Sequence, residues 1–248
     1  LPNARSVSVG QTATAFATLI NPPSFGTNGT NCRIEPPANF NGGFTYRTTN
    51  PTTNEATGTA DTPIDIASGG NQSFVFGFTP GTVLNGQVLA PVFRCDNVMP
   101  ASTTTGVTTL TLSAAAIPTA DVITIAATAS ANGIATAPLN AATAFSVASL
   151  NIGAAETVTV SVSDGGANLP LTLEICETNP ANGQCTSARG SSVNASYSAN
   201  GTRTFSVFVR GTGQAVALAP ATNRVFVSFA NAGGVSVGAT SVAVQTAP

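Results

Sequence analysis

Apolar and polar residues alternate with a period of two over many short stretches of the chain. The clearest are Gln72–Phe78, Val107–Leu112, Val122–Ala126, Glu156–Val162, Thr204–Val209 and Arg224–Phe229. Successive side chains of a strand point to opposite faces, so this period is typical of strands with one buried face. Turn signals rich in Gly, Asn and Pro separate these stretches, as at Gly69–Asn71 and Thr79–Gly81. Short strands with regularly spaced turns predict an all-β sandwich or barrel.

The two halves of the chain carry similar features in the same order. The run Thr12–Asn21 is echoed by Ala142–Asn151, and the run Ser68–Phe76 is echoed by Ala199–Phe208. Each member of the second pair is a Gly/Asn turn followed by a strand rich in aromatic residues. The conserved order of these features indicates two homologous domains in tandem.

The boundary between the domains is expected near Ala114–Pro118, because proline removes a backbone donor and does not fit within a central strand. This gives one domain of residues 1–116 and a second of residues 117–248. Each has a length that suits an immunoglobulin-like sandwich. We therefore predict an all-β fold of two tandem immunoglobulin-like β-sandwich domains.

The chain contains four cysteines, Cys32, Cys95, Cys176 and Cys185. A zinc site usually combines Cys and His at short spacings, but the chain has no His and no CxxC motif. Disulfides are the favoured interpretation, with free structural thiols as the alternative, and they imply an oxidising compartment. We expect Cys176 and Cys185 to close a hairpin loop. Cys32 and Cys95 are expected to bridge the two sheets of the first domain.

The chain is poor in charge, with 7% charged residues and a formal net charge of −2. This is unlike the basic footprint of nucleic-acid-binding proteins, so no nucleic acid partner is expected. No apolar run reaches the roughly 18 residues of a membrane-spanning helix, so no membrane span is expected. The absence of His and Lys removes Ser-His-Asp, Cys-His and Ser-Lys mechanisms. We expect no cofactor.

Acidic pairs are the remaining candidates for catalysis, since a glycosidase needs two carboxylates at one site. Asp61 with Asp65, and Glu174 with Glu177, are close in sequence. Asp61 is better interpreted as the acid of the turn at Pro63. Strand alternation places Glu174 and Glu177 on opposite faces. We therefore expect no enzyme.

Calcium binding would need several clustered oxygen ligands. Asp164–Asn168 and Asp96–Asn97 offer scattered oxygens and are better interpreted as ordinary Asx turns, so no metal site is expected. Arginines within the predicted strands are interpreted as guards of strand edges, with acidic-sugar binding as the alternative. Asp96 is expected to pair with Arg94 or Arg33 near the predicted Cys32–Cys95 bridge.

The sequence resembles a known group of proteins in four runs. These are TATAFATLIN, TPIDIASGGNQSFVFGFTP, LPLTLEICETNPANGQC and NRVFVSFANAGGVSVGATSVAV. They resemble a tandem immunoglobulin-like pair that recurs in large secreted bacterial cell-surface proteins, mostly of unassigned function. The resemblance implies the sandwich fold and an extracellular or cell-surface location. It implies no catalytic residue.

The terminal runs Arg5–Ile20 and Gly234–Gln245 are β-prone and almost uncharged, so their unpaired backbone groups can serve as templates for another chain. We expect a non-catalytic extracellular structural protein, a building block of a bacterial surface filament or stalk. Its partners would be copies of itself or neighbouring immunoglobulin-like repeats, joined through edge strands and domain contacts. The alternative is an adhesin module that binds carbohydrate or cells, with surface glycans as partners. The chain begins at Leu1 without a signal peptide, as expected of a processed form or a fragment.

Overall fold

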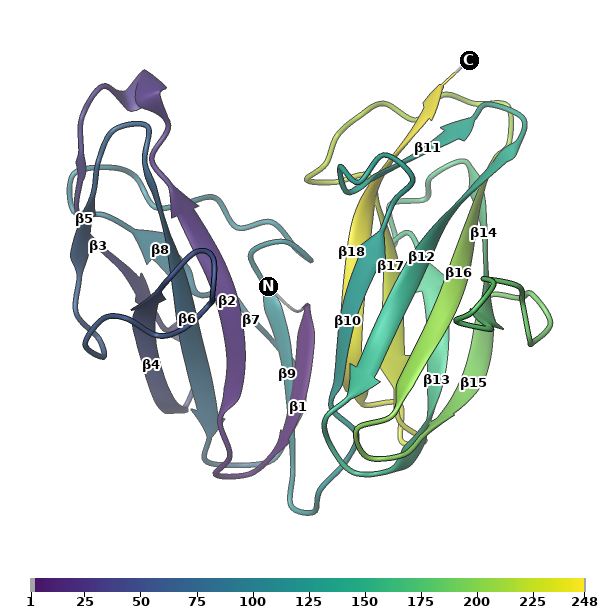
Figure 1. Cartoon of the computed structure of the whole chain (residues 1–248), viewed down its shortest axis with the longest axis horizontal. Helices are drawn as coiled ribbons and strands as arrows, with labels where there is room; N and C mark the ends of the chain where they lie inside the picture. Colours follow the sequence, from purple (N-terminus) through teal and green to yellow (C-terminus); the bar gives the residue numbers. More distant parts are fainter. Residues whose placement is uncertain (1–2, 248) are drawn as a thin grey trace.

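The computed structural model describes residues 3–247, which form two β-sandwiches side by side (Figure 1). Leu1, Pro2 and Pro248 lie outside the described residues. Among the described residues the one helical element is a single 3-10 turn, Pro23–Phe25. Within residues 3–247 no helix has the length and apolar character needed to cross a membrane. The prediction of an all-β fold with two immunoglobulin-like sandwiches is confirmed.

Each sandwich has nine strands. Those of the first are β1 (Ala4–Ser8), β2 (Ala13–Ile20), β3 (Gly29–Glu35), β4 (Gly42–Thr49), β5 (Ile64–Ile66), β6 (Asn71–Pro80), β7 (Leu84–Leu89), β8 (Val92–Arg94) and β9 (Leu110–Ala115). Those of the second are β10 (Val122–Ala127), β11 (Ile134–Pro138), β12 (Ala142–Asn151), β13 (Glu156–Ser163), β14 (Leu171–Thr178), β15 (Ser192–Tyr197), β16 (Thr202–Gly211), β17 (Arg224–Ala230) and β18 (Ser236–Ala247).

The two sandwiches share one topology, as the internal repeat predicts. In the second sandwich one sheet has the order β11-β18-β17-β13-β15 and the other β10-β12-β16-β14. In the first, β1-β9-β7 and β5-β3-β8 together correspond to the first of these sheets. β7 and β8 take the place of β17, separated by Ala90 and Pro91. The remaining sheet, β2-β6-β4, corresponds to β12-β16-β14 and has no counterpart of β10.

The last strand of each sandwich pairs in parallel with an early strand, which is β1 in the first sandwich and β11, the strand after β10, in the second. Ala4 of β1 pairs with Thr111 of β9, and Ile134 of β11 pairs with Ala243 of β18. β9 ends at Ala115 and β10 begins at Val122, so the proposed boundary between residues 116 and 117 falls in their connection.

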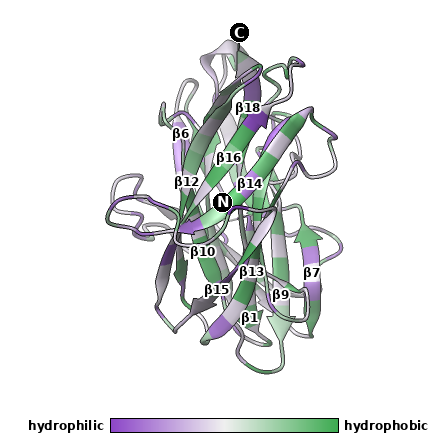
Figure 2. Ribbon diagram, turned by 90° about the vertical axis from the view of Figure 1, so that its right-hand side faces the viewer, coloured by the Kyte–Doolittle hydropathy of each residue, from purple (hydrophilic) through white to green (hydrophobic). Residues whose placement is uncertain are grey.

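The sheets bury one face of each strand, as the alternating sequence pattern requires. On β6 the buried side chains are Phe74, Phe76 and Phe78, whose rings form the centre of the first core. The second core consists mostly of valines around Phe205 and Phe229, whose ring centroids lie 5.7 Å apart. Figure 2 shows hydrophobic stretches alternating with white and hydrophilic bands along the strands of this sandwich.

Two of the predicted strand runs differ from the structure. The run Arg5–Ile20 forms two strands, β1 and β2, because the chain turns at Gly10, whose φ of 83° is in the left-handed region. The run Val107–Leu112 enters β9 only at Leu110. Before it, the backbone N–H groups of Val107 and Thr108 both bond to the carbonyl of Thr104 in a turn.

Candidate interaction site

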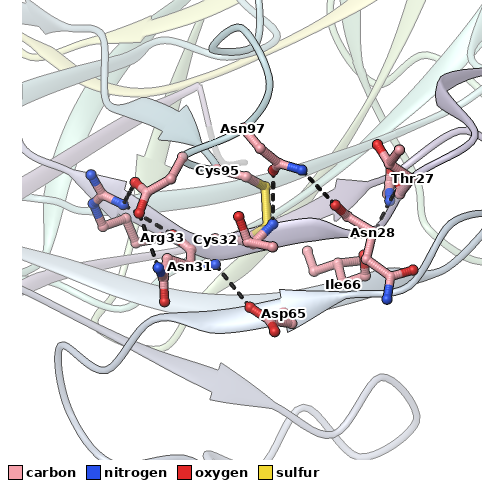
Figure 3. Close-up of a disulfide and its surroundings, with 12 residues drawn as sticks. Thr27, Asn28, Asn31, Cys32, Arg33, Asp65, Ile66, Cys95 and Asn97 are labelled. Atoms are coloured by element: carbon pink, nitrogen blue, oxygen red, sulfur yellow. Dashed lines mark hydrogen bonds and ion pairs between the residues drawn. A yellow bond between two sulfur atoms is a disulfide. The ribbon is translucent and has the colours of Figure 1, made fainter.

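Two disulfides join the four cysteines. Cys32 of β3 is bonded to Cys95, just after β8, with an S–S distance of 2.00 Å (Figure 3). β3 and β8 are antiparallel neighbours in one sheet, with Arg33 opposite Arg94, so the next residues along, Cys32 and Cys95, also face each other. The expectation of a bridge between the two sheets is wrong, because this register already brings the sulfurs together within one sheet. Cys176 is bonded to Cys185 across the loop that follows β14.

A network of polar groups surrounds the first disulfide (Figure 3). Arg33 forms ion pairs with Glu35 at 2.8 Å and with Asp96 at 2.6 Å. The hydrogen bond from Arg33, aided by one from Asn31, lowers the pKa of the Asp96 carboxyl below its usual value. Arg94 reaches Glu35 at 3.7 Å. These arginines are therefore already paired with acids within the protein, which does not favour the acidic-sugar alternative.

The acidic pairs considered for catalysis do not converge. Asp61 accepts the backbone N–H of Tyr46, and Asp65 accepts that of Asn31. The two carboxylates thus bond to different strands, Asp61 to β4 and Asp65, on β5, to β3, and neither of these bonds caps the turn at Pro63. Glu177 is paired with Arg203 at 3.2 Å. Glu174 lies on the same strand but, three residues away, on its opposite face.

The oxygens considered for calcium also serve local turns. The Asp164 carboxylate accepts the N–H groups of Gly166 and Leu169, and Asp96 is engaged by Arg33. Within residues 3–247 no three acidic or cysteine side chains are grouped so that they could hold a metal ion.

The junction between the sandwiches contains a buried ion pair that the sequence analysis did not single out. Arg5 of β1 and Asp121, just before β10, lie 2.8 Å apart between the Nη2 and Oδ2 atoms, and both side chains are 6% exposed. Asp121 also accepts the backbone N–H of Ser6 at 3.1 Å. The other end of the Arg5 guanidinium donates to the carbonyl of Thr14 on β2. A signal was present, since Asp121 follows the predicted boundary in a chain with few charges.

Further hydrogen bonds extend this junction along β9 and β18. The Ser113 hydroxyl donates to the carbonyl of Ser236 at 2.6 Å. The Ser241 hydroxyl donates to the carbonyl of Gly106 at 3.0 Å and accepts from the Asn3 amide at the same distance. The sandwiches are therefore held together at several points along their neighbouring strands, which Figure 1 shows side by side.

An apolar groove of about 630 Å³ lies beside β2 in the first sandwich. One wall is the second half of β2, from Ala17 to Ile20, with the following Asn21, and the other includes Phe93, Val98 and Val107. Met99 at its rim is 90% exposed, and Ile20 on β2 is 70% exposed. The terminal β-prone runs predict open edges at the chain ends, but no sequence pattern indicates this groove.

Comparison with known proteins adds little to this description. No protein-family model and no curated protein matches the chain. Two crystal structures of BcpA, the major pilin subunit of Bacillus cereus, match 94% of this chain with 13% identity; the chain covers 70% and 69% of them, at TM-scores of 0.28 and 0.24. The crystal structure titled DIP-gamma IG1+IG2 matches 99% of this chain and 94% of its own, with 7% identity and a TM-score of 0.23. The chain is thus described by its fold alone, as two tandem immunoglobulin-like β-sandwiches.

Proposed function

We propose that this protein is a non-catalytic extracellular structural unit, a building block of a surface filament or stalk. The observation that carries the proposal is the junction of the two sandwiches. The ion pair of Arg5 and Asp121 is buried, and hydrogen bonds such as that from Ser113 to Ser236 continue the contact along the neighbouring strands. Two domains that move freely relative to each other need no buried charges at their junction. A stiff repeating unit benefits from such contacts, because they fix the angle between its domains.

The strand order also suits a part that carries load. β1 runs parallel to β9, and β11 runs parallel to β18. When force pulls two parallel neighbours apart along their length, all the hydrogen bonds of the ladder resist together instead of opening one after another. Each sandwich presents such a parallel ladder between its last strand and an early strand, β1 or β11.

The disulfides would limit how far a loaded unit can extend. Cys32 and Cys95 are 63 positions apart, so their bond removes about 210 Å of extensible chain from the first sandwich. Both bonds require an oxidising compartment to form, which supports an extracellular location.

The proposal is tested by the assembly state of the protein. Sedimentation velocity across a wide concentration range, with negative-stain electron microscopy of the same samples and of material from the native source, should show chains of repeating two-sandwich units. Their spacing along the polymer should equal the length of the two-sandwich unit. A monodisperse monomer at every concentration, with no polymer in the native material, would overturn the proposal.

A further inference from the structure

The first sandwich lacks a strand that the second one has. β10 pairs antiparallel with β12 at the outer edge of its sheet, whereas the corresponding edge of β2 pairs with no strand among residues 3–247. The correspondence of β2 with β12 is fixed by one residue in each. Asn21 donates its backbone N–H to Gly70, and Asn151 donates its own to Gly201, both at 2.9 Å.

The missing strand leaves inward-facing side chains of β2 partly uncovered. Counting back from the two asparagines, Ala17 and Leu19 correspond to Val147 and Ser149. In the second sandwich β10 extends the sheet beside β12, and Val147 and Ser149 are 0% and 5% exposed. In the first sandwich Ala17 and Leu19 are only half-buried and line the groove.

The opposite wall of the groove also matches the surroundings of β10. The Thr124 hydroxyl of β10 donates to the carbonyl of Ala239 on β18. β9 corresponds to β18 in the parallel ladders, and Val107, in the turn just before β9, lines the groove. The groove therefore lies where β10 lies in the other repeat.

The free edge of β2 also presents backbone groups in the right direction. Both backbone groups of Asn21 bond toward β6, to Gly70 and Gly69. Because these directions alternate along an antiparallel strand, the N–H and C=O groups of Phe16, Thr18 and Ile20 face the open side. These are the positions whose counterparts on β12 face β10.

We propose that this groove is a docking site for one extended segment of another polypeptide, which adds to β2 as an antiparallel strand. The docking site is independent of the proposed function. Only the source of the segment, a neighbouring subunit, rests on it. β10 defines the chemistry of the segment: uncharged, with small or β-branched residues at alternate positions, as in Val122, Thr124 and Ala126, which face inward. Backbone hydrogen bonds would supply affinity, and the groove would select the inward side chains.

The test uses a fluorescent peptide with the sequence of residues 122–128 and the complete protein. Fluorescence anisotropy should show saturable binding, and saturating peptide should raise the melting temperature of the protein. A peptide with charged residues at the places of Val122 and Thr124 should not bind, since those side chains would enter an apolar groove.

The decisive variant is Thr18→Pro, because the N–H of Thr18 faces the open side and its loss leaves the ladder between β2 and β6 intact. Peptide binding should weaken at least about ten-fold, the effect of roughly 1.4 kcal/mol of lost contacts. Thr18→Val, which keeps the N–H and the branched shape, should bind as the natural protein does. Circular dichroism confirms folding of both.

A second pair of variants covers the case in which proline disturbs the fold. Ala17→Glu places a charge in the groove and should abolish binding, whereas Ala148→Glu, on the exposed face of β12, should not. Absence of peptide binding, or binding that Thr18→Pro and Ala17→Glu leave unchanged, would overturn the docking proposal.

Sedimentation separates this inference from the proposed function. If the protein polymerises and Thr18→Pro prevents it, the docked segment comes from another copy. If the protein binds the peptide but neither polymerises nor forms polymers in its native source, the docking site stands and the filament proposal fails. If polymers form and the peptide does not bind, the filament proposal stands and the docking site fails.

Discussion

The buried ion pair at the junction makes a quantitative prediction about how the two sandwiches are coupled. Arg5 and Asp121 lie 2.8 Å apart with 6% of each side chain exposed, so solvent screens the charges little. Two unit charges about 4 Å apart interact by about 4 kcal/mol at an effective dielectric constant of about 20. Asp121→Asn leaves the Arg5 cation buried with only neutral acceptors, which should destabilise the protein by about 3–5 kcal/mol.

The second single variant, Arg5→Met, leaves the Asp121 carboxylate buried with the Ser6 N–H as its remaining donor from the first sandwich. Its cost should be similar for the same reason. The double variant Arg5→Met/Asp121→Asn leaves no charge behind. It should lose far less than the sum of the two singles, with a coupling energy of at least about 2 kcal/mol.

The assay is equilibrium unfolding in urea, followed by signals that distinguish the sandwiches. The chain has two tyrosines and no tryptophan, and Tyr46 lies in the first sandwich and Tyr197 in the second. Tyrosine fluorescence of versions carrying Tyr46→Phe or Tyr197→Phe therefore follows each sandwich in turn. The natural junction should give one shared transition, and either single variant should give two. Single variants that cost less than about 1 kcal/mol, or that add without coupling, would refute the reasoning.

Three further predictions follow from the disulfides and the tyrosines. By the chain-entropy model, closing 63 positions stabilises the first sandwich by about 4 kcal/mol and closing 9 stabilises the second by about 2.6 kcal/mol. Reduction should therefore lower the melting temperature of the first sandwich more, and equal shifts would contradict this. Burial raises the pKa of Tyr197 to about 12, so the folded protein keeps a proton that the unfolded chain loses near pH 10. Stability of the second sandwich should be constant below pH 10 and then fall by up to about 2.7 kcal/mol as the pH rises to 12, a fall that the Tyr197→Phe variant should lack. Among the described residues the buried Tyr46 hydroxyl has no hydrogen-bond partner, whereas that of Tyr197 bonds to Ser149 at 2.6 Å. Tyr46→Phe should therefore be neutral or stabilising in thermal unfolding, and Tyr197→Phe should cost about 1 kcal/mol; the reverse order would contradict the assignment.

Strand positions were predictable because they depend on local alternation. The aromatic run of β6, with Phe74, Phe76 and Phe78 all facing one side, is an example of a pattern that only a strand can bury on one face. The repeat also predicted equivalent roles correctly, since β2 and β12 each pair with the aromatic strand of their own sandwich. Local patterns, however, do not say which sheet a strand joins. The Cys32–Cys95 bridge is therefore expected between the two sheets, whereas its two cysteines lie on neighbouring strands of one sheet.

The junction and the groove depend on long-range contacts that alternation does not encode. Arg5 and Asp121 are far apart in the sequence, and nothing local indicates that they meet.

The two parts of the β2 edge differ in how they are protected, and this difference supports a binding role for the open part. An open strand edge is an aggregation hazard, and proteins usually protect it with charge, proline or a covering segment. Here the beginning of β2 is protected, because Arg5, one of eight basic residues in the chain, donates to the carbonyl of Thr14. A few residues further on, Ile20 is 70% exposed and lines the apolar groove, without such protection. If the only need were to prevent strand pairing, both parts of the edge would be protected. A site that binds one strand at one place instead needs a protected part beside an open part.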